Sequence, residues 1–403
     1  AVVVIVNLIC FIPMSSMISL AMGNGTITDE TSDESTALVQ EIAEEGIVLL
    51  KNDGTLPLAA DSNLNVFGWA STNPCYGGTG SGALSDAYPT VSLLQGLEDA
   101  GFNLNTELSD FYTAYRADRP EVGMWAQDWT LPEPTADSYT DEMMANAKEF
   151  SDTAMVVITR VGGEGADLPT DVSKVTYTDN STEYKDFEAG EHYLQLDRTE
   201  RDMLDLVCSN FDNVIVVYNG ANAMELGFID EYSQIKSAIW CPGTGQSGFE
   251  ALGEIVAGTV NPSGKTSDTF VADLTATPTW NNFGYFKYDN MDEYAYTSNN
   301  FKTGEEETAL PSFVNYVDGI YVGYRFYETA AAEGLINYDD TVVYPFGYGL
   351  SYTTFTQEMG AISEDNGTIS FDVTVTNTGD VAGKDVVEVY YNPPYTNGGI
   401  EKA

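Results

Sequence analysis

The chain has 403 residues, of which 43% are hydrophobic and 12% are aromatic. This length predicts two or three folding units, and the apolar content excludes a wholly disordered chain. The 62 Asp and Glu residues far outnumber the 16 Lys and Arg residues, which gives a formal net charge of −46. A field of this sign repels phosphate backbones and acidic polysaccharides, so we expect no nucleic-acid partner and a neutral or cationic ligand.

The first 22 residues, AVVVIVNLICFIPMSSMISLAM, carry no charge. They are long enough to span a bilayer, and a cleaved secretory signal peptide is the close alternative. A buried core helix is the third reading. We favour a membrane anchor, and we expect the natural start to lie upstream because the chain does not begin with Met. Residues 23–36 are polar and acidic, which is typical of a linker. Either favoured reading predicts an extracellular or cell-surface protein.

From residue 37 onward, short apolar runs alternate with helical patterns. Leu38 and Ile42 predict an amphipathic helix that ends at Gly46. Thr199 is a helix N-cap signal. Strands are predicted at residues 47–52, 64–70, 154–159, 214–219 and 237–241, and helices at 91–101, 199–211 and 248–258. Such alternation predicts an α/β sandwich with a mainly parallel, doubly wound sheet that is covered by helices on both faces.

The pattern changes in the last third of the chain. Residues 280–335 lack a clear period; Tyr321, Tyr324 and Tyr327 recur at a spacing more typical of a packed helical face than of a ligand platform. After Tyr344, the run ISFDVTVTNTGDVAGKDVVEVYYNPP alternates apolar and polar residues, which predicts a β-sandwich. It supplies about three of roughly seven strands, so we expect that domain to continue beyond Ala403.

Glu164 lies at the tip of the loop in VVITRVGGEGAD, residues 156–167. The glycines at 162, 163 and 165 allow the backbone to approach a ligand closely. Loops that follow the strands of a parallel sheet line its ligand crevice, so a carboxylate held there is a candidate proton donor or acceptor. The alternative is a surface Glu in a flexible turn.

Metal and phosphate sites are not indicated. The cysteines are far apart and form no CxxC pair, which excludes a zinc spacing and a disulfide framework: Cys10, Cys75, Cys208 and Cys241. His192 is the only histidine, so a His-based triad is not expected. The loop Gly77 to Gly82 lacks the G-x-x-x-x-G-K-[ST] pattern, which excludes a P-loop.

Seven sequence blocks occur in one order along the chain. They are EEGIVLLKNDGTLPL (44–58), YGGTGSGAL (76–84), VVITRVGGEGADLP (156–169), VIVVYNGANAMEL (214–226), CPGTGQSGFEALGEIVAGTVNPSGK (241–265), YVDGIYVGYRFYE (316–328) and YPFGYGLSYTTF (344–355). Together they resemble glycoside hydrolase family 3, the β-glucosidase-like enzymes. The resemblance covers roughly residues 40–403. It implies the family's C-terminal-type α/β sandwich domain over residues 37–355 and an incomplete fibronectin-III-like domain over residues 356–403.

The usual family order places a (β/α)₈ barrel before the sandwich domain, and the barrel supplies the nucleophilic Asp. Here the apolar leader stands in that place. This chain is similar to members with the reversed order, so we expect a downstream barrel of the same polypeptide. Without the nucleophile, the fragment is expected to be inactive alone.

The resemblance implies hydrolysis of terminal β-linked glucose or xylose from oligosaccharides and glycosides by a retaining mechanism, with no cofactor. Such enzymes use two carboxyl groups about 5–5.5 Å apart. By position, Glu164 is the acid/base, and its pKa is expected to be raised by burial and by the charge of the nucleophile. The alternative is a non-catalytic carbohydrate-binding or scaffold module at the cell surface.

Four further residues are candidates for substrate binding. Asp167 and Gly163 belong to the acid/base loop, but the family often has Glu-Gly-x-Asp-Arg and this chain has Leu168 in place of the Arg. An insertion at residues 171–191 follows. Trp69 stacks on a sugar ring or packs in the core, and His192 contacts substrate or is a solvated loop residue. The loop Gly77 to Gly82 reaches the sugar or forms a structural turn.

Overall fold

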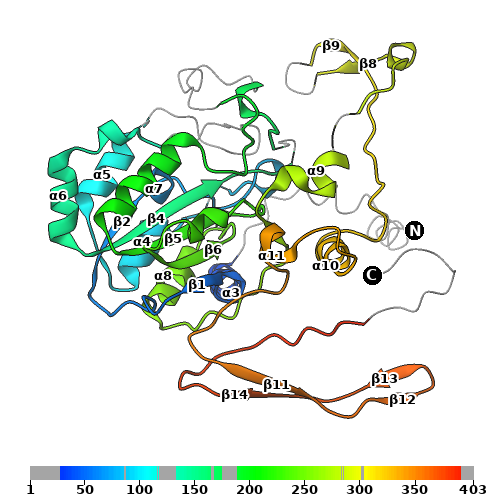
Figure 1. The fold of residues 1–403 in the computed structure, drawn as a ribbon. Coiled ribbons are helices and arrows are strands. Elements are labelled where there is room, and N and C mark those ends of the chain that lie inside the picture. Colours follow the sequence, from blue (N-terminus) through cyan, green and yellow to red (C-terminus); the bar gives the residue numbers. More distant parts are fainter. Residues whose placement is uncertain are drawn as a thin grey trace, which may run out of the picture.

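The computed structural model describes residues 28–85, 88–115, 117, 133–164, 168–174, 188–282, 284, 286–300 and 304–391. A six-stranded sheet with helices on both faces forms its centre (Figure 1). The predicted anchor or signal segment, residues 1–22, lies outside these ranges. Within them, no helix combines the length and apolarity needed to cross a membrane.

The central sheet has the strand order β1-β6-β5-β4-β2-β3. Its strands are β1 (Val48–Asn52), β2 (Asn63–Phe67), β3 (Asn103–Leu104), β4 (Thr153–Arg160), β5 (Asn213–Gly220) and β6 (Ile235–Cys241). All neighbours pair in parallel except β1, which runs antiparallel to β6 at one edge. The predicted mainly parallel sheet is therefore confirmed, and its central strands β4 and β5 are buried on both faces, as their apolar runs require.

The strands send alternate side chains into two separate cores. In β5, Val216 and Tyr218 enter one core, whereas Ile215 and Val217 enter the other. The first core is closed by α5 (Thr106–Ala114), α6 (Asp141–Phe150) and α7 (Arg198–Asn210). The second is closed by α4 (Leu93–Asp99) and α8 (Phe249–Ala257). Figure 1 shows these two helical layers on opposite faces of the sheet.

Helix boundaries follow their capping residues. The helix α8 stops at Gly258, whose φ of +75° is left-handed, as the glycine stop predicts. The helix α7 begins one residue before the prediction, because its N-cap is Asp197 and not Thr199. The Asp197 carboxylate accepts the Glu200 N–H at 2.7 Å, and the Glu200 carboxylate accepts the Asp197 N–H at 3.1 Å. This reciprocal capping box satisfies two donors at the helix start.

The helix α3 (Asp29–Gly46) occupies part of the predicted linker at residues 23–36. Thr28 caps it, and Asp29 and Glu30 lie in its first turn, where carboxylates stabilise the helix dipole. The acidic run is therefore helical from Asp29. The helix ends at Gly46 as predicted, but Ile42 on its predicted apolar face is 63% exposed among the described residues.

Small helices and strands lie between residues 270 and 344. They are β7 (Phe270–Val271) paired with β10 (Val342–Tyr344), α9 (Pro278–Asn282), the hairpin β8 (Tyr296–Asn299) and β9 (Glu306–Ala309), α10 (Tyr324–Ala332) and α11 (Tyr338–Thr341). Of the predicted tyrosine face, Tyr324 and Tyr327 lie in α10, whereas Tyr321 precedes that helix. Tyr327 is buried and Tyr324 stacks on Phe346, which is packing and not a ligand platform.

The C-terminal part contains two small antiparallel sheets. The strand β11 (Phe355–Met359) pairs with β14 (Val373–Asn377), and β12 (Ser363–Asp365) pairs with β13 (Thr368–Ser370). Their side chains are largely exposed. These hairpins only weakly indicate the predicted fibronectin-III-like sandwich, and they do not close one within the described residues.

Candidate active site

Two glycine-rich loops meet beyond the carboxyl ends of β2 and β4. The first spans residues 75–84, and the second begins at residue 161, directly after β4. A Cβ on Gly78 would lie 2.8 Å from the Gly162 carbonyl oxygen, and a Cβ on Gly163 would lie 2.4 Å from the Thr79 nitrogen. Only glycine permits this approach of the two backbones. The glycines are therefore required by the contact between the loops.

The first loop holds the Glu164 carboxylate in place. Glu164 Oε2 accepts the Ser81 N–H at 2.9 Å and the Ser81 hydroxyl at 2.5 Å. The Thr79 hydroxyl donates to the Glu164 main-chain oxygen at 3.2 Å. Gly80 has a φ of +62°, and a Cβ there would lie 2.5 Å from Glu164 Cβ. The loop after β2 thus decides where this carboxylate lies.

The hydrogen bonds from Ser81 lower the pKa of Glu164 below its ordinary value, because they stabilise the charged form. The side chain is exposed, so burial opposes this shift only weakly. No charged side chain of the described residues contributes to the shift. The expected rise of the Glu164 pKa depends on the charge of a nucleophile outside the described residues, so it stays a prediction.

Arg160 anchors the base of the acid/base loop. It is the last residue of β4, it is fully buried, and all five of its N–H groups are used. Its Nε donates to the Tyr193 carbonyl at 2.6 Å, and Nη1 and Nη2 donate to the Thr159 and Gln195 carbonyls at 2.8 and 2.6 Å. Both Nη atoms also donate to the Glu200 carboxylate at 2.7 Å. This network fixes residues 193–195 against the end of β4.

Two of the predicted substrate-binding residues have structural roles. Trp69 is the first residue of the 3₁₀ turn Trp69–Ser71 after β2. Its side chain is buried in the core, with 6% of the residue exposed. Stacking on a sugar needs an exposed ring face, and this ring has none. His192 is also buried, with its Nε2 3.0 Å from Glu225 Oε1 and its ring edge-on to Trp280. It is therefore not a solvated loop residue, and its contact with a substrate stays a prediction. Asp167 lies outside the described residues, and Gly163 forms the loop contact described above.

Glu133 and Ser81 are site residues that sequence reasoning missed. Glu133 Oε2 accepts the Trp69 N–H at 2.8 Å, and Oε1 accepts the Tyr139 hydroxyl at 2.5 Å. The Tyr139 hydroxyl lies 2.6 Å from that of Tyr112. Burial raises the pKa of Glu133 to about 8. The buried Glu133 carboxyl group holds the turn after β2, and no sequence signal marks it. Ser81 could have been found from the sequence, because its hydroxyl lies between two glycines.

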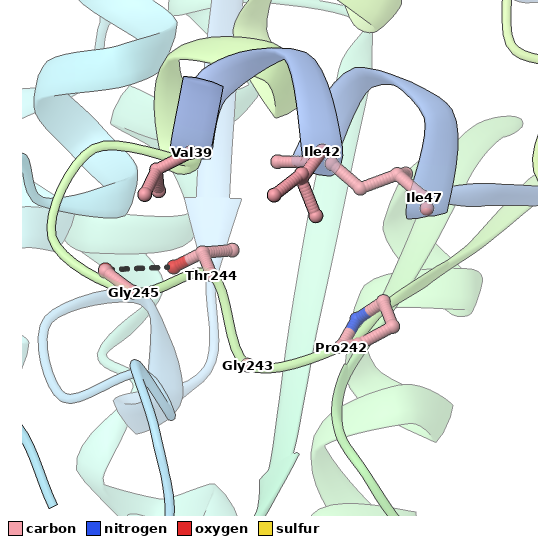
Figure 2. Close-up of a pocket in the computed structure, with 9 residues that line it drawn as sticks. Val39, Ile42, Ile47, Pro242, Gly243, Thr244 and Gly245 are labelled. Carbon is pink, nitrogen blue, oxygen red and sulfur yellow. Dashed lines mark hydrogen bonds between the residues drawn. The ribbon is translucent and has the colours of Figure 1, made fainter. Parts of the chain in front are cut away.

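A separate apolar pocket of about 270 Å³ lies between α3 and the loop after β6 (Figure 2). No side chain among the nine lining residues is titratable; they are Val39, Ile42, Ala43, Gly46, Ile47, Pro242, Gly243, Thr244 and Gly245. Such a lining supplies no acid or base. In the part of the chain that the structure describes, no cluster of three or more His, Cys, Asp or Glu residues is arranged to hold a metal ion.

The fold and the loops define a doubly wound α/β domain that presents a carboxylate at the edge where such sheets bind ligands. The chain belongs to glycosyl hydrolase family 3: the model of that family's C-terminal domain matches residues 47–352. This result confirms the family that the sequence blocks predict.

Several proteins that the chain resembles are β-glucosidases. The chain is 32% identical to beta-glucosidase A of Butyrivibrio fibrisolvens, over 93% of this chain and 44% of that protein. It is 30% identical to a beta-glucosidase of Ruminococcus albus, over 88% of this chain and 32% of that protein. The crystal structure of a beta-glucosidase from Paenibacillus barengoltzii matches with a TM-score of 0.65 and 30% identity, over 86% of this chain and 33% of that chain. The chain thus spans less than half the length of these relatives.

Proposed function

We propose that this chain supplies the general acid/base of a retaining β-glucosidase, and that Glu164 has this role. The observation that supports it best is the exposed carboxylate at the carboxyl edge of the sheet, held by two hydrogen bonds from Ser81 on a neighbouring loop. An exposed position leaves the carboxyl group within reach of a substrate. A fixed position is what proton transfer requires, because the donor must lie within hydrogen-bonding distance of the reacting oxygen.

In this mechanism, Glu164 donates its proton to the glycosidic oxygen while a nucleophilic carboxylate attacks the anomeric carbon. Glu164 then takes a proton from the water that hydrolyses the glycosyl-enzyme. Within the described residues, the lowered pKa keeps Glu164 in the carboxylate form at neutral pH, which suits only the second step. The first step needs a neighbouring negative charge to raise the pKa of Glu164.

That second carboxylate is proposed to come from a (β/α)₈ barrel in the same polypeptide, downstream of this chain. The length of the relatives supports a further domain, because they are more than twice as long as the matched region. A nucleophile about 5–5.5 Å from Glu164 gives the retaining geometry. The 403-residue chain alone is then expected to lack glycosidase activity.

The proposed substrate is a terminal β-linked glucose, with β-linked xylose as the second choice, in an oligosaccharide or glycoside. The names of the relatives support glucose, and the charge of −46 is compatible with a neutral sugar. Asp167 is proposed to contact the sugar together with Glu164.

We also propose an extracellular or cell-surface location, with residues 1–22 as an anchor or signal and residues 356–403 as the start of a fibronectin-III-like domain. A non-catalytic binding module is not favoured by any of these observations.

The test uses the full-length gene product with Glu164→Gln, beside Glu149→Gln as a control on the exposed face of α6. Cleavage of aryl β-glucosides and β-xylosides is measured with poor and with activated leaving groups. We expect Glu164→Gln to lose cleavage of poor leaving groups and to keep more on activated ones, which need less protonation, while Glu149→Gln behaves as the parent. Equal activity of Glu164→Gln and the parent on both substrates would exclude this residue as the acid/base.

A further inference from the structure

Asn219 connects the central sheet to the loop that holds Glu164. It is the last but one residue of β5 and is fully buried. Its Oδ1 accepts the Cys75 N–H at 2.5 Å, and its Nδ2 donates to the Cys75 carbonyl at 3.1 Å. The side-chain amide thus satisfies both main-chain groups of one residue. Cys75 is the first residue of the glycine-rich loop that carries Ser81.

The same residue binds the ends of the two strands beside β5. Its Nδ2 also donates to the carbonyl of Cys241, the last residue of β6, at 3.0 Å. Its main-chain oxygen accepts the hydroxyl of Thr159, near the end of β4, at 2.8 Å. The ends of β4, β5 and β6 therefore meet around Asn219, together with the loop at residues 75–84.

We propose that Asn219 is a positioning residue, which sets the start of the loop at residues 75–84 so that Ser81 reaches the Glu164 carboxylate. The amide fixes both main-chain groups of Cys75, and only five residues lie between Cys75 and Ser81. No water replaces a lost partner easily at a fully buried site, so removal of the amide leaves the Cys75 end of the loop unsatisfied. The effect of Asn219 on catalysis rests on the proposed function of Glu164, whereas its effect on the position of the loop does not.

Asn65 offers a matched comparison within the same sheet. It lies in β2 and is equally buried. Its Nδ2 donates to the carbonyls of Ala147 and Ser151 at 2.8 and 3.2 Å, and its Oδ1 accepts the Asn105 amide at 2.9 Å. These partners belong to the end of α6 and the start of α5, not to the glycine-rich loops. Loss of either asparagine amide should therefore destabilise the fold, but only Asn219 should affect Glu164.

The experiment measures the pKa of Glu164 in the 403-residue chain by NMR titration of ¹³C-carboxyl-labelled glutamate, with the signal assigned from Glu164→Gln. Asn219→Ala, Asn65→Ala and Ser81→Ala are compared. We expect Asn219→Ala to shift the pKa of Glu164 upward, in the same direction as Ser81→Ala, because a displaced loop no longer brings the Ser81 N–H and hydroxyl to the carboxylate. Asn65→Ala should leave it unchanged.

An unchanged pKa of Glu164 in Asn219→Ala overturns the inference. An equal pKa shift in Asn65→Ala also overturns it, because that result would reflect a general loss of stability. If Asn219→Ala does not fold, Asn219→Asp takes its place with the same outcomes, since it keeps the side-chain shape but loses the amide donors. The titration does not require activity. Full activity of Glu164→Gln in the full-length product would refute the proposed function, while the titration alone would still decide the role of Asn219.

Discussion

Ser81 donates two hydrogen bonds, from its main-chain N–H and its hydroxyl, to a single carboxylate oxygen of Glu164, 83 residues away in the sequence. Both donors are neutral, so they stabilise the charged carboxylate without an ion pair. The Glu164 side chain is thereby fixed on an exposed loop by a residue from another loop. The first two predictions concern this contact.

Ser81→Ala should raise the pKa of Glu164 towards its ordinary value, because the hydroxyl donor is lost while the main-chain donor remains. A lowered pKa stabilises the folded chain above the ordinary pKa, and this contribution disappears as the pH falls through the lowered value. The variant should therefore be less sensitive to acid. NMR titration of Glu164 checks the shift. The control is Ser109→Ala on α5, whose hydroxyl bonds only to the Thr106 carbonyl in its own helix, and no change is expected there.

Gly80→Ala should separate the two loops. The new Cβ would lie 2.5 Å from Glu164 Cβ and 2.9 Å from its Oε2, at a φ of +62°. Gly319 is the matched control, because its φ is +60° and no atom lies within 4 Å of its added Cβ. Both substitutions cost the left-handed strain of about 1 kcal/mol, but only Gly80→Ala should also displace Glu164. The readouts are urea unfolding and the Glu164 titration; equal effects of the two variants on the titration would contradict this account.

Glu200→Gln should destabilise the chain by about 3–5 kcal/mol, because it leaves the buried guanidinium of Arg160 without its negative partner. The amide can still cap α7, so the change removes mainly the charge. The control is Asp230→Asn, which breaks a 2.9 Å ion pair with Lys51 in which Asp230 is 74% exposed. That change should cost less than about 1 kcal/mol. Urea unfolding at neutral pH measures the free energy of unfolding of both variants. If Glu200→Gln loses as little as Asp230→Asn, the buried Arg160 does not need the negative charge of Glu200.

Glu133→Gln should remove a pH dependence of stability. Burial raises the pKa of Glu133 from 4.5 to about 8, so the folded chain keeps a proton that the unfolded chain releases. The contribution is complete below about pH 4.5 and is lost as the pH rises through about 8. Relative to Glu133→Gln, the parent should lose roughly 4 kcal/mol of unfolding free energy between about pH 5 and pH 8. Urea unfolding at both pH values measures this, and a constant difference between the two proteins would refute the raised pKa.

Local sequence patterns predicted most of the sheet. Five of the strands had been marked by their apolar runs, and the Gly258 helix stop and the Gly46 helix end were found where the glycines indicate. The two-residue strand β3 and the helices α5 and α6 were missed, although Asn105 and Thr140 cap those helices. Their apolar positions are few, so the pattern is weak. The acidic run after Thr28 predicts a linker but forms the start of α3, because charge alone does not distinguish a solvated helix from a loop.

The sequence by itself determined the class of fold, the family and the loop on which Glu164 lies, because strand periodicity, glycine spacing and block order are local properties. Only the tertiary structure decided that Ser81 binds Glu164, that Trp69 and His192 are covered, and that Glu133 is buried. Burial and hydrogen-bond partners depend on which distant segments pack together, and a residue's own neighbours in the chain carry no record of that packing. The pKa of Glu164 is lowered for the same reason, because its hydrogen-bond donor Ser81 comes from another loop.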